Sequence, residues 1–173
     1  SCTGCMEDDA QNFDPLNIFD GDNCTYDPTL EAVDDVSFIE DVETAEITLV
    51  GADVDEGDIL TYSISSSSNI VATVDGANVI LSGFLDFNGV EVVTAIVSDG
   101  IGDASQTFEV TVTPVNDAPT LVAIEEVVFE EGSTTSITLL GADVDDGDVL
   151  TYTITAGIDI TSEIEGASVA FSA

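Results

Sequence analysis

The sequence contains no lysine, arginine or histidine, whereas aspartate and glutamate together number 36, so the formal net charge is −36 at pH 7. A chain without cationic side chains cannot neutralise phosphates, which excludes nucleic-acid binding. The lack of histidine and lysine also excludes catalytic triads and most general-base schemes. Hydrolysis by two carboxylates remains chemically possible, but nothing in the sequence singles out a pair. We therefore predict that this segment is not an enzyme and binds no nucleic acid.

Long apolar runs are absent as well. Since about 18 consecutive apolar residues are needed to span a bilayer, we expect no membrane insertion in this segment. Hydrophobic residues nevertheless make up 44% of the chain, which is far too many for an acidic disordered tail. The carboxylates of such a folded chain repel one another, and divalent cations would supply the missing positive charge. The simpler interpretation is that the acidic surface serves solubility alone.

A tandem repeat organises most of the chain. The segment GADVDEGDILTY at 51–62 returns as GADVDDGDVLTY at 141–152, an offset of 90. PTLEAVDDVSFIED at 28–41 likewise returns as PTLVAIEEVVFEEG at 119–132, an offset of 91. Self-similarity at a fixed period indicates one folded module per copy. We predict a small module at 1–27, a first repeat at 28–117 and a second repeat at 118–173.

Short runs rich in Val, Ile, Thr and Phe alternate with Gly, Asp and Asn clusters, which is typical of an all-β sandwich. The pattern predicts seven strands in the first repeat, near 36–40, 45–50, 59–65, 70–74, 78–82, 91–98 and 105–113. The last is the clearest, with Phe108, Val110 and Val112 on one face. Seven strands in about 90 residues fit an immunoglobulin-like fold. The prolines of PVNDAP at 114–119 predict a linker.

The second copy lacks counterparts of residues 84–117, because Ala173 aligns with Gly83. These residues include the last two predicted strands, whose apolar faces we assign to Val92, Ile96, Phe108, Val110 and Val112. The free energy of burial lost with that many side chains exceeds the total stability of a small domain. We therefore expect residues 119–173 to be unstable as an isolated monomer. Further chain or a neighbouring subunit would complete the repeat by strand addition, with self-association into a fibre as the expected result.

The most informative motif is DVDEGD, which carries Asp53, Asp55 and Asp58 between two predicted strands. The second copy places Asp143, Asp145 and Asp148 at the same positions. Carboxylates two residues apart in a loop can converge on one hard cation, and oxygen ligands suit Ca²⁺. The alternative is that Asp and Gly merely shape a turn. Three Asp in six residues, present in both copies, favour calcium over a bare turn.

The motifs ADVDEGDILTYSI, LDFNG at 85–89, VSDG at 97–100 and VTPVNDAPT at 112–120 resemble, in this order, a bacterial cadherin-like repeat. The resemblance covers 28–173 and implies seven-stranded Greek-key sandwiches of the cadherin and immunoglobulin type, with calcium bound between successive modules. It implies that linker residues Asn116 and Asp117 share a cation with Asp143 and Asp145. The further ligands that it implies are Asp86, Asn88, Asp99, Glu40 and, in a register uncertain by one residue, Glu130 or Glu131.

All three cysteines lie within the first 24 residues, which indicates an oxidising exterior and leaves one odd thiol. The segment GCMEDDAQNFDPLNIFDGDNCTY at 4–26 resembles short thrombospondin type-3-like units. This resemblance implies a Cys5–Cys24 disulfide, with Cys2 free or bonded to a neighbouring chain. It also implies calcium ligands among Asn12, Asp14, Asp20 and Asp22. A disulfide knot without metal is the alternative.

These observations favour an extracellular, calcium-rigidified structural protein, either a segment of a cell-surface stalk or the protomer of a fibre. One alternative is an adhesin whose repeats recognise carbohydrate or protein. The absence of Trp and the presence of only three Tyr weigh against it, and we expect Tyr62 and Tyr152, at matched strand positions, to lie in the core. Another alternative is a non-catalytic appendage of a secreted hydrolase.

Overall fold

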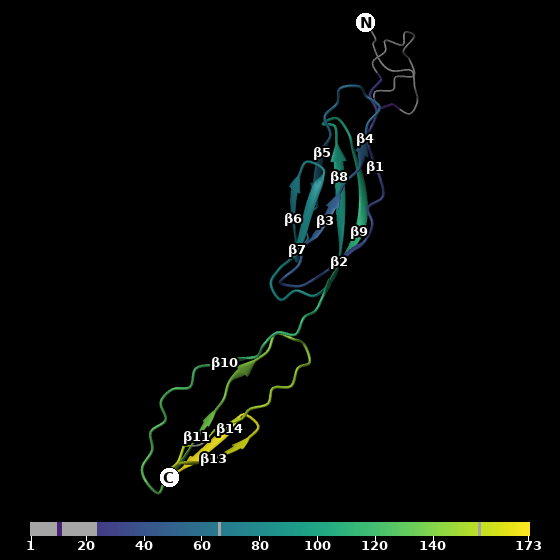
Figure 1. The fold of residues 1–173 in the computed structure, drawn as a ribbon. Coiled ribbons are helices and arrows are strands. Elements are labelled where there is room, and N and C mark those ends of the chain that lie inside the picture. Colours follow the sequence, from purple (N-terminus) through teal and green to yellow (C-terminus); the bar gives the residue numbers. More distant parts are fainter. Residues whose placement is uncertain (1–9, 12–23, 66, 156) are drawn as a thin grey trace. The chain divides into compact units, whose positions relative to one another are not determined.

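The computed structural model describes residues 10–11, 24–65, 67–155 and 157–173. It divides into two units, Ser1–Val115 (unit 1) and Asn116–Ala173 (unit 2), so the division falls inside the PVNDAP segment. Every regular element in the described residues is a β-strand (Figure 1). The prediction of an all-β fold is therefore confirmed.

Unit 1 is a sandwich of two sheets (Figure 1). One sheet has four strands in the order β2-β9-β8-β5, and the other has three in the order β3-β7-β6. These strands are β2 (Val36–Ile39), β3 (Ala45–Thr48), β5 (Thr61–Ile64), β6 (Ile70–Asp75), β7 (Asn78–Gly83), β8 (Gly89–Ser98) and β9 (Asp103–Thr113). They coincide with the seven predicted strands, apart from shifts of a few residues at the ends.

Two further strands were not predicted, namely β1 (Thr29–Leu30) and β4 (Gly51–Ala52), which pair antiparallel with each other. The first two strands of the chain thus belong to different sheets. β1 pairs with β4 in a separate two-stranded sheet, whereas β2 pairs parallel with β9 in the four-stranded sheet. Strands of two residues carry no readable alternation, so the sequence pattern could not show them.

The core lies between the two sheets. On β9, Phe108, Val110 and Val112 are at most 3% exposed, which confirms their predicted common face. On β8 the predicted face was wrong, because Val92 is 65% exposed and Ile96 is only half-buried. The inward residues of β8 are instead those one position later along the strand, and they are buried: Val93, Ala95 and Val97. Val93 lies opposite Phe108 in the register of the pair, so it shares the core face of that residue.

A contact that recurs in both units links the repeated glycine to the repeated tyrosine. The N–H of Gly51 donates to Tyr62 Oη at 3.3 Å, and the N–H of Gly141 donates to Tyr152 Oη at 3.1 Å. Both tyrosines are half-buried. A Cβ built on Gly51 would lie 2.9 Å from Tyr62 Oη and 2.9 Å from Val97 Cγ2. The close approach of the ring explains why both copies keep a glycine here.

We expect Gly51→Ala to destabilise unit 1 by about 1–3 kcal/mol, the usual cost of overpacking a filled site. The lower entropy of the unfolded alanine chain offsets less than about 1 kcal/mol of this. Thermal unfolding followed by circular dichroism measures the effect. Gly83→Ala is the control, since a Cβ there meets its nearest atoms at an ordinary 3.7 Å. Equal melting temperatures for the two variants would contradict the steric argument.

Unit 2 reproduces only part of this arrangement. Its strands are β10 (Thr120–Leu121), β11 (Thr134–Thr138), β12 (Gly141–Ala142), β13 (Thr161–Glu165) and β14 (Ser168–Ser172). They form a three-stranded sheet in the order β11-β14-β13 and a two-stranded sheet β10-β12. β11 pairs with β14 in the same register in which β3 pairs with β7, as Thr135↔Phe171 matches Ala45↔Leu81. One of the two sandwich sheets is therefore complete in unit 2.

The other sheet is not formed in the described part of unit 2. Residues 127–130 and 151–154, the counterparts of β2 and β5, are not in strands. In unit 1, β2 pairs with β9 and β5 pairs with β8, and unit 2 has no counterpart of β8 or β9 among its described residues. The described part of the second repeat thus contains one of the two sheets of unit 1.

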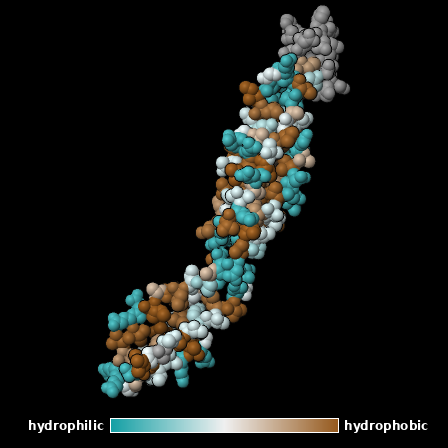
Figure 2. Space-filling model, in the orientation of Figure 1, coloured by the Kyte–Doolittle hydropathy of each residue, from teal (hydrophilic) through white to brown (hydrophobic). Residues whose placement is uncertain are grey.

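The core of unit 2 is correspondingly open. Leu121 is 53% exposed although its counterpart Leu30 is 7% exposed, and Ile160 is 39% exposed against 6% for Ile70. Among the hydrophobic residues described in unit 2, only Leu139 and Val169 are buried. Figure 2 shows the resulting apolar surface over this unit.

Candidate cation-binding loops

The loop after β4 is a tight turn built by its aspartates. Asp53 Oδ1 accepts the N–H of Asp55 at 2.8 Å, and the carbonyl of Asp55 accepts the N–H of Asp58 at 3.4 Å. Gly57 has a φ of 105°, which a residue with a side chain rarely adopts. Part of the Asp-Gly pattern therefore does shape a turn, as the simpler interpretation proposes.

Unit 2 repeats this turn in detail after β12. Asp143 Oδ1 accepts the N–H of Asp145 at 3.1 Å, and the carbonyl of Asp145 accepts the N–H of Asp148 at 3.4 Å. Gly147 has a φ of 101°. The same local sequence thus forms the same loop in both units, whether or not the second sheet is present.

In unit 1 a third element, the β8–β9 loop, brings Asp99 to the turn. Carboxylate oxygens of Asp53, Asp58 and Asp99 lie within 4.8 Å of one another. Asp99 Oδ1 accepts the N–H groups of Ile101 at 2.6 Å and Gly102 at 2.7 Å. The remaining oxygens, Asp53 Oδ2 and Asp99 Oδ2, are buried and have no hydrogen-bond partner. Turn formation does not account for these two oxygens.

Two carboxyl groups of this cluster, those of Asp99 and Asp58, have pKa values shifted in opposite directions. Hydrogen bonds from the N–H groups of Gly102 and Ile101 lower the pKa of Asp99. Desolvation, followed by the negative charges of Asp55, Asp53 and Asp99, raises the pKa of Asp58. Asp99 is thus held ionised, whereas Asp58 bears the repulsion of its neighbours. A divalent cation would relieve that repulsion.

The middle aspartate of each loop holds the chain that precedes its own repeat. Asp55 Oδ2 accepts the N–H of Tyr26 at 2.7 Å, and Asp145 Oδ2 accepts the N–H of Asp117 at 2.7 Å. Tyr26 and Asp117 correspond at the offset of 91. The loop therefore fixes the entering chain in the same way in both units.

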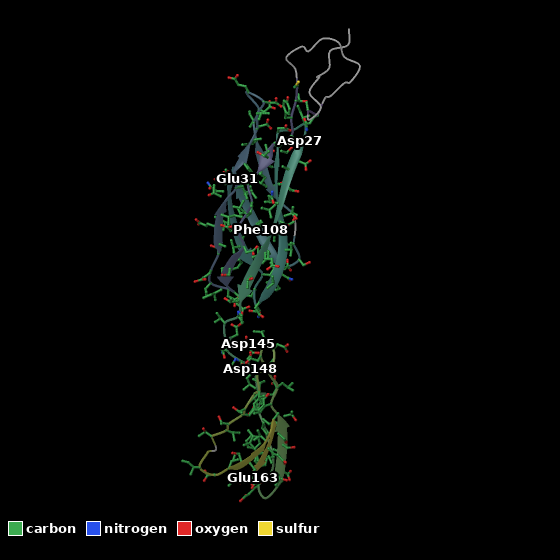
Figure 3. All side chains as sticks on the ribbon, turned by 90° about the vertical axis from the view of Figure 1, so that its right-hand side faces the viewer. Asp27, Glu31, Phe108, Asp145, Asp148 and Glu163 are labelled. Carbon is green, nitrogen blue, oxygen red and sulfur yellow. The ribbon has the colours of Figure 1, made fainter. Side chains whose placement is uncertain are left out.

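The linker residues predicted as ligands lie beside the loop of unit 2. Asn116 Nδ2 donates to the carbonyl of Asp117 at 2.6 Å. Carboxylate oxygens of Asp143, Asp145 and Asp148 lie within 4.8 Å of one another. Asp145 and Asp148 are labelled in Figure 3. A cleft of about 410 Å³ is lined by Asn116, Asp117, Asp143, Asp148 and further residues up to 153. A counterpart of Asp99 is lacking among the described residues of this unit.

The other predicted ligands of unit 1 gather elsewhere, around Glu40. This residue is 1% exposed, and its Oε1 accepts the N–H of Val115 at 2.7 Å while its Oε2 accepts Asn88 Nδ2 at 3.3 Å. Nearby, Asp41 Oδ1 accepts the N–H of Asp86 at 2.9 Å. The sequence analysis did not include Asp41, whose φ of 64° is unusual for a residue other than glycine and is visible only in the structure.

The two predicted sets of ligands therefore lie at opposite ends of unit 1. Asn88 directly precedes β8, and Asp99 directly follows it. Ten residues of strand separate them, which corresponds to roughly 30 Å. They cannot share one cation.

The structure shows which residue of the second repeat, Glu130 or Glu131, corresponds to Glu40. Gly132 has a φ of 74° and occupies the position of Asp41, so Glu131 is the counterpart of Glu40 and Glu130 is not. Glu131 is exposed. The groups that bind Glu40 in unit 1, Asn88 and Val115, have no counterparts in unit 2.

The predictions for the N-terminal module fall largely outside the described residues. This applies to Cys2, to Cys5 of the predicted Cys5–Cys24 disulfide, and to the candidate ligands Asn12, Asp14, Asp20 and Asp22. Their roles stay predictions. The described residues contain no helix that is long and apolar enough to cross a membrane.

Comparisons with known proteins give similarity in structure alone. No family model matches the sequence, and no curated protein matches it. The EC1-2 fragment of human protocadherin-24 is 21% identical over 84% of this chain and 79% of its own, with a TM-score of 0.45. The endo-fucoidan hydrolase MfFcnA4 from glycoside hydrolase family 107 is 22% identical over 84% of this chain, with a TM-score of 0.45. This chain spans 24% of the length of that hydrolase. The cadherin-like resemblance stays a prediction from the sequence motifs.

Proposed function

We propose that this chain is a calcium-rigidified structural segment of an extracellular stalk or fibre. The observation that carries the proposal is the pair of buried oxygens without partners, Asp53 Oδ2 and Asp99 Oδ2, in a chain without a single cationic side chain. Buried charges are ordinarily paired or coordinate a metal. A donor set made only of oxygens suits calcium.

The residues that would hold the ions follow from the geometry. In unit 1 they are Asp53, Asp58 and Asp99, whose oxygens already lie within 4.8 Å of one another. In unit 2 they are Asp143, Asp145 and Asp148, with the linker residues beside them. The bound ion would neutralise the carboxylates and fix the loop onto which the entering chain is hydrogen-bonded.

The linker explains how such ions would stiffen the chain. The N–H of Val115 is bound by Glu40 in unit 1, and the N–H of Asp117 is bound by Asp145 in unit 2. Asn116 alone lies between these two anchored groups. An ion held by the Asp143–Asp148 loop and linker oxygens would therefore restrict the few torsions that remain free between the units. The segment would become a stiff spacer rather than a hinge.

Weak sites are sufficient for this role. With a Kd of roughly 10⁻⁴ to 10⁻³ M, typical of extracellular modules, and about 2 mM free calcium, each site adds about 0.6–1.8 kcal/mol of stability. We expect the N-terminal module, with the proposed Cys5–Cys24 disulfide, to bind calcium in the same exterior environment.

The test is the melting temperature of the full chain in 2 mM calcium and in excess chelator at constant ionic strength. A stabilisation of 1 kcal/mol shifts the melting temperature of a domain of 60–100 residues by roughly 4–8 °C, so we expect calcium to raise it by at least several degrees. Magnesium at the same concentration controls for general screening of the −36 charge. Identical melting in calcium and chelator would sink the proposal.

Matched variants locate the site. Asp53→Asn and Asp99→Asn should each remove most of the calcium response of unit 1, because each removes a ligand charge. Without calcium Asp53→Asn should melt no lower than the parent, since it also removes repulsion. Asp99→Asn should melt lower, because the N–H groups of Ile101 and Gly102 stabilise the ionised carboxylate. Asp75→Asn makes the same charge change at an exposed position of β6 and should keep the full response. A response lost equally in all three would indicate screening instead of a site.

A further inference from the structure

The open face of unit 2 carries an inference that does not depend on the cation. We propose that this face is the docking site for a β-hairpin of the same chemistry as β8–β9, presented by polypeptide other than residues 116–173 or a second copy of residues 1–173. The first repeat shows what covers the equivalent face, so the occupant can be described residue by residue.

In unit 1 the covering element is the β8–β9 hairpin. β9 pairs parallel with β2, placing Val110 opposite Val36 and Val112 opposite Phe38. β8 pairs antiparallel with β5, placing Val97 opposite Tyr62. The hairpin contributes six side chains to the core, each at most 3% exposed: Val93, Ala95, Val97, Phe108, Val110 and Val112. It therefore supplies half of the twelve buried residues in the core cluster of this repeat.

Unit 2 keeps the residues that receive such a hairpin. Val127 and Phe129 stand at the positions of Val36 and Phe38, and Tyr152 stands at that of Tyr62. The buried pair Leu139 and Val169 stands at the positions of Leu49 and Val79, which belong to the core under the hairpin in unit 1. The side chains that pack with the hairpin in unit 1 thus have counterparts in unit 2. The described residues of unit 2 contain no counterpart of the hairpin itself.

The cleft at the edge of the core is larger in unit 2 than in unit 1, as expected for a core that is not covered. In unit 1 a cleft of about 240 Å³ lies between residues 31–36 and 47–50. The homologous cleft of unit 2, between 122–128 and 137–140, measures about 410 Å³. It contains Val122, Ile124, Val128 and Leu140, which are 55–82% exposed. The counterparts of Val122, Val128 and Leu140 in unit 1, namely Glu31, Ser37 and Val50, are exposed as well. The size of the cleft, and not this lining, therefore distinguishes the two units.

These positions define the occupant. One strand, like β9, should run parallel to 127–130, and the other, like β8, antiparallel to 151–154. The side chains at the positions of the six buried hairpin residues must be apolar, because a charge there would be buried without a counter-charge. The outward positions are not restricted, as the exposed Val92 and its neighbour Glu109 on the outer face of unit 1 illustrate.

The probe that tests the proposal is a synthetic peptide of residues 84–117 added to the full chain, with amide hydrogen exchange as readout. We expect protection at least 10-fold higher over 127–130 and 151–154, the two segments that gain ladder partners. A peptide carrying Val93→Asp and Val110→Asp should bind at least 10-fold more weakly. A peptide carrying Val90→Asp and Val92→Asp, two outward positions that are 58% and 65% exposed, should bind like the parent peptide.

A tethered version removes the dependence on peptide solubility. Residues 84–117 are fused after Ala173 through a flexible linker, which raises their effective concentration to the millimolar range. We expect the same two segments to become protected and unit 2 to melt at a higher temperature. The inward double variant in the fused copy should abolish both effects.

Three results would overturn the proposal. The first is full protection of 127–130 and 151–154 in the dilute chain without peptide, and the second is a fused chain without gain in protection. The third is protection that rises only with chain concentration, which would assign the face to a second copy. Each experiment is run in calcium and in chelator, so that a failure of the proposed calcium site leaves the result on the hairpin readable.

Discussion

Leu81→Ala is expected to lower the free energy of unfolding of unit 1 by about 2–5 kcal/mol, the range measured for large-to-small changes in filled cores. Leu81 is 0% exposed and lies on β7, the central strand of its sheet. Removing its side chain loses the burial of the atoms and leaves a cavity facing the β8–β9 side of the core. This is a large fraction of the total stability of a domain of this size.

The neighbouring residue provides the control. Ile80 is 43% exposed and points away from the core on the same strand, so Ile80→Ala should cost less than about 1 kcal/mol. Urea denaturation of both variants in chelator separates the packing effect from any effect of calcium. A similar loss for both would mean that the two faces of β7 are not distinguished in solution.

The pair Ile80 and Leu81 also illustrates what sequence periodicity can and cannot decide. β9 alternates apolar and polar residues clearly enough to predict both the strand and its inward face. β7 reads Val-Ile-Leu at 79–81, so alternation does not show that Ile80 points outward. β8 reads Val-Glu-Val-Val-Thr-Ala-Ile-Val from Val90 onward, with apolar residues on both faces. Alternation cannot choose a phase there, and a shift of one residue exchanges the two faces. Pairing with β9 decides the phase, and that contact is not local in the sequence.

Unit 2 shows the same dependence on partners at the level of whole strands. Residues 151–154 differ from β5 at one position, and residues 127–130 keep the Val and Phe of β2, yet neither segment is in a strand. The turn around Asp143–Asp148, by contrast, forms as in unit 1. Turns depend on local hydrogen bonds and on glycine, whereas edge strands depend on a neighbour. The sequence therefore predicts the candidate loops more completely than the sheets around them.

The candidate site was only partly readable from the sequence for a related reason. The repeat pointed directly to Asp53 and Asp58, because they lie in one short loop. Asp99 could be placed beside them only through a family resemblance, since four strands, β5 to β8, separate it from them in the chain. The buried, partnerless oxygens of Asp53 and Asp99 have no sequence signal at all. They depend on how closely two loops approach, which only the folded structure specifies.

Glu40→Ala is expected to destabilise unit 1 by about 1–3 kcal/mol, the cost of leaving buried donors without a partner. The Glu40 side chain is 1% exposed and accepts hydrogen bonds from the N–H of Val115 and from Asn88. Its loss should therefore also loosen the last residues before the linker, which amide exchange at Val115 would reveal. The counterpart substitution Glu131→Ala, at an exposed position, should change stability by less than about 0.5 kcal/mol.

Glu40→Gln separates the structural role from a role in binding calcium. The amide oxygen can still accept the N–H of Val115, and rotation of the Asn88 amide can restore the second hydrogen bond, so stability in chelator should stay within about 1 kcal/mol of the parent. If Glu40 also contributes to an ion held near Asp41 and Asp86, Glu40→Gln should reduce the stabilisation by calcium while leaving the response that depends on Asp53 and Asp99 intact. A full calcium response in Glu40→Gln would restrict the role of this carboxylate to anchoring Val115. Melting curves in calcium and chelator for Glu40→Ala, Glu40→Gln and Glu131→Ala decide between the two roles, because only Glu40→Ala removes the anchor itself.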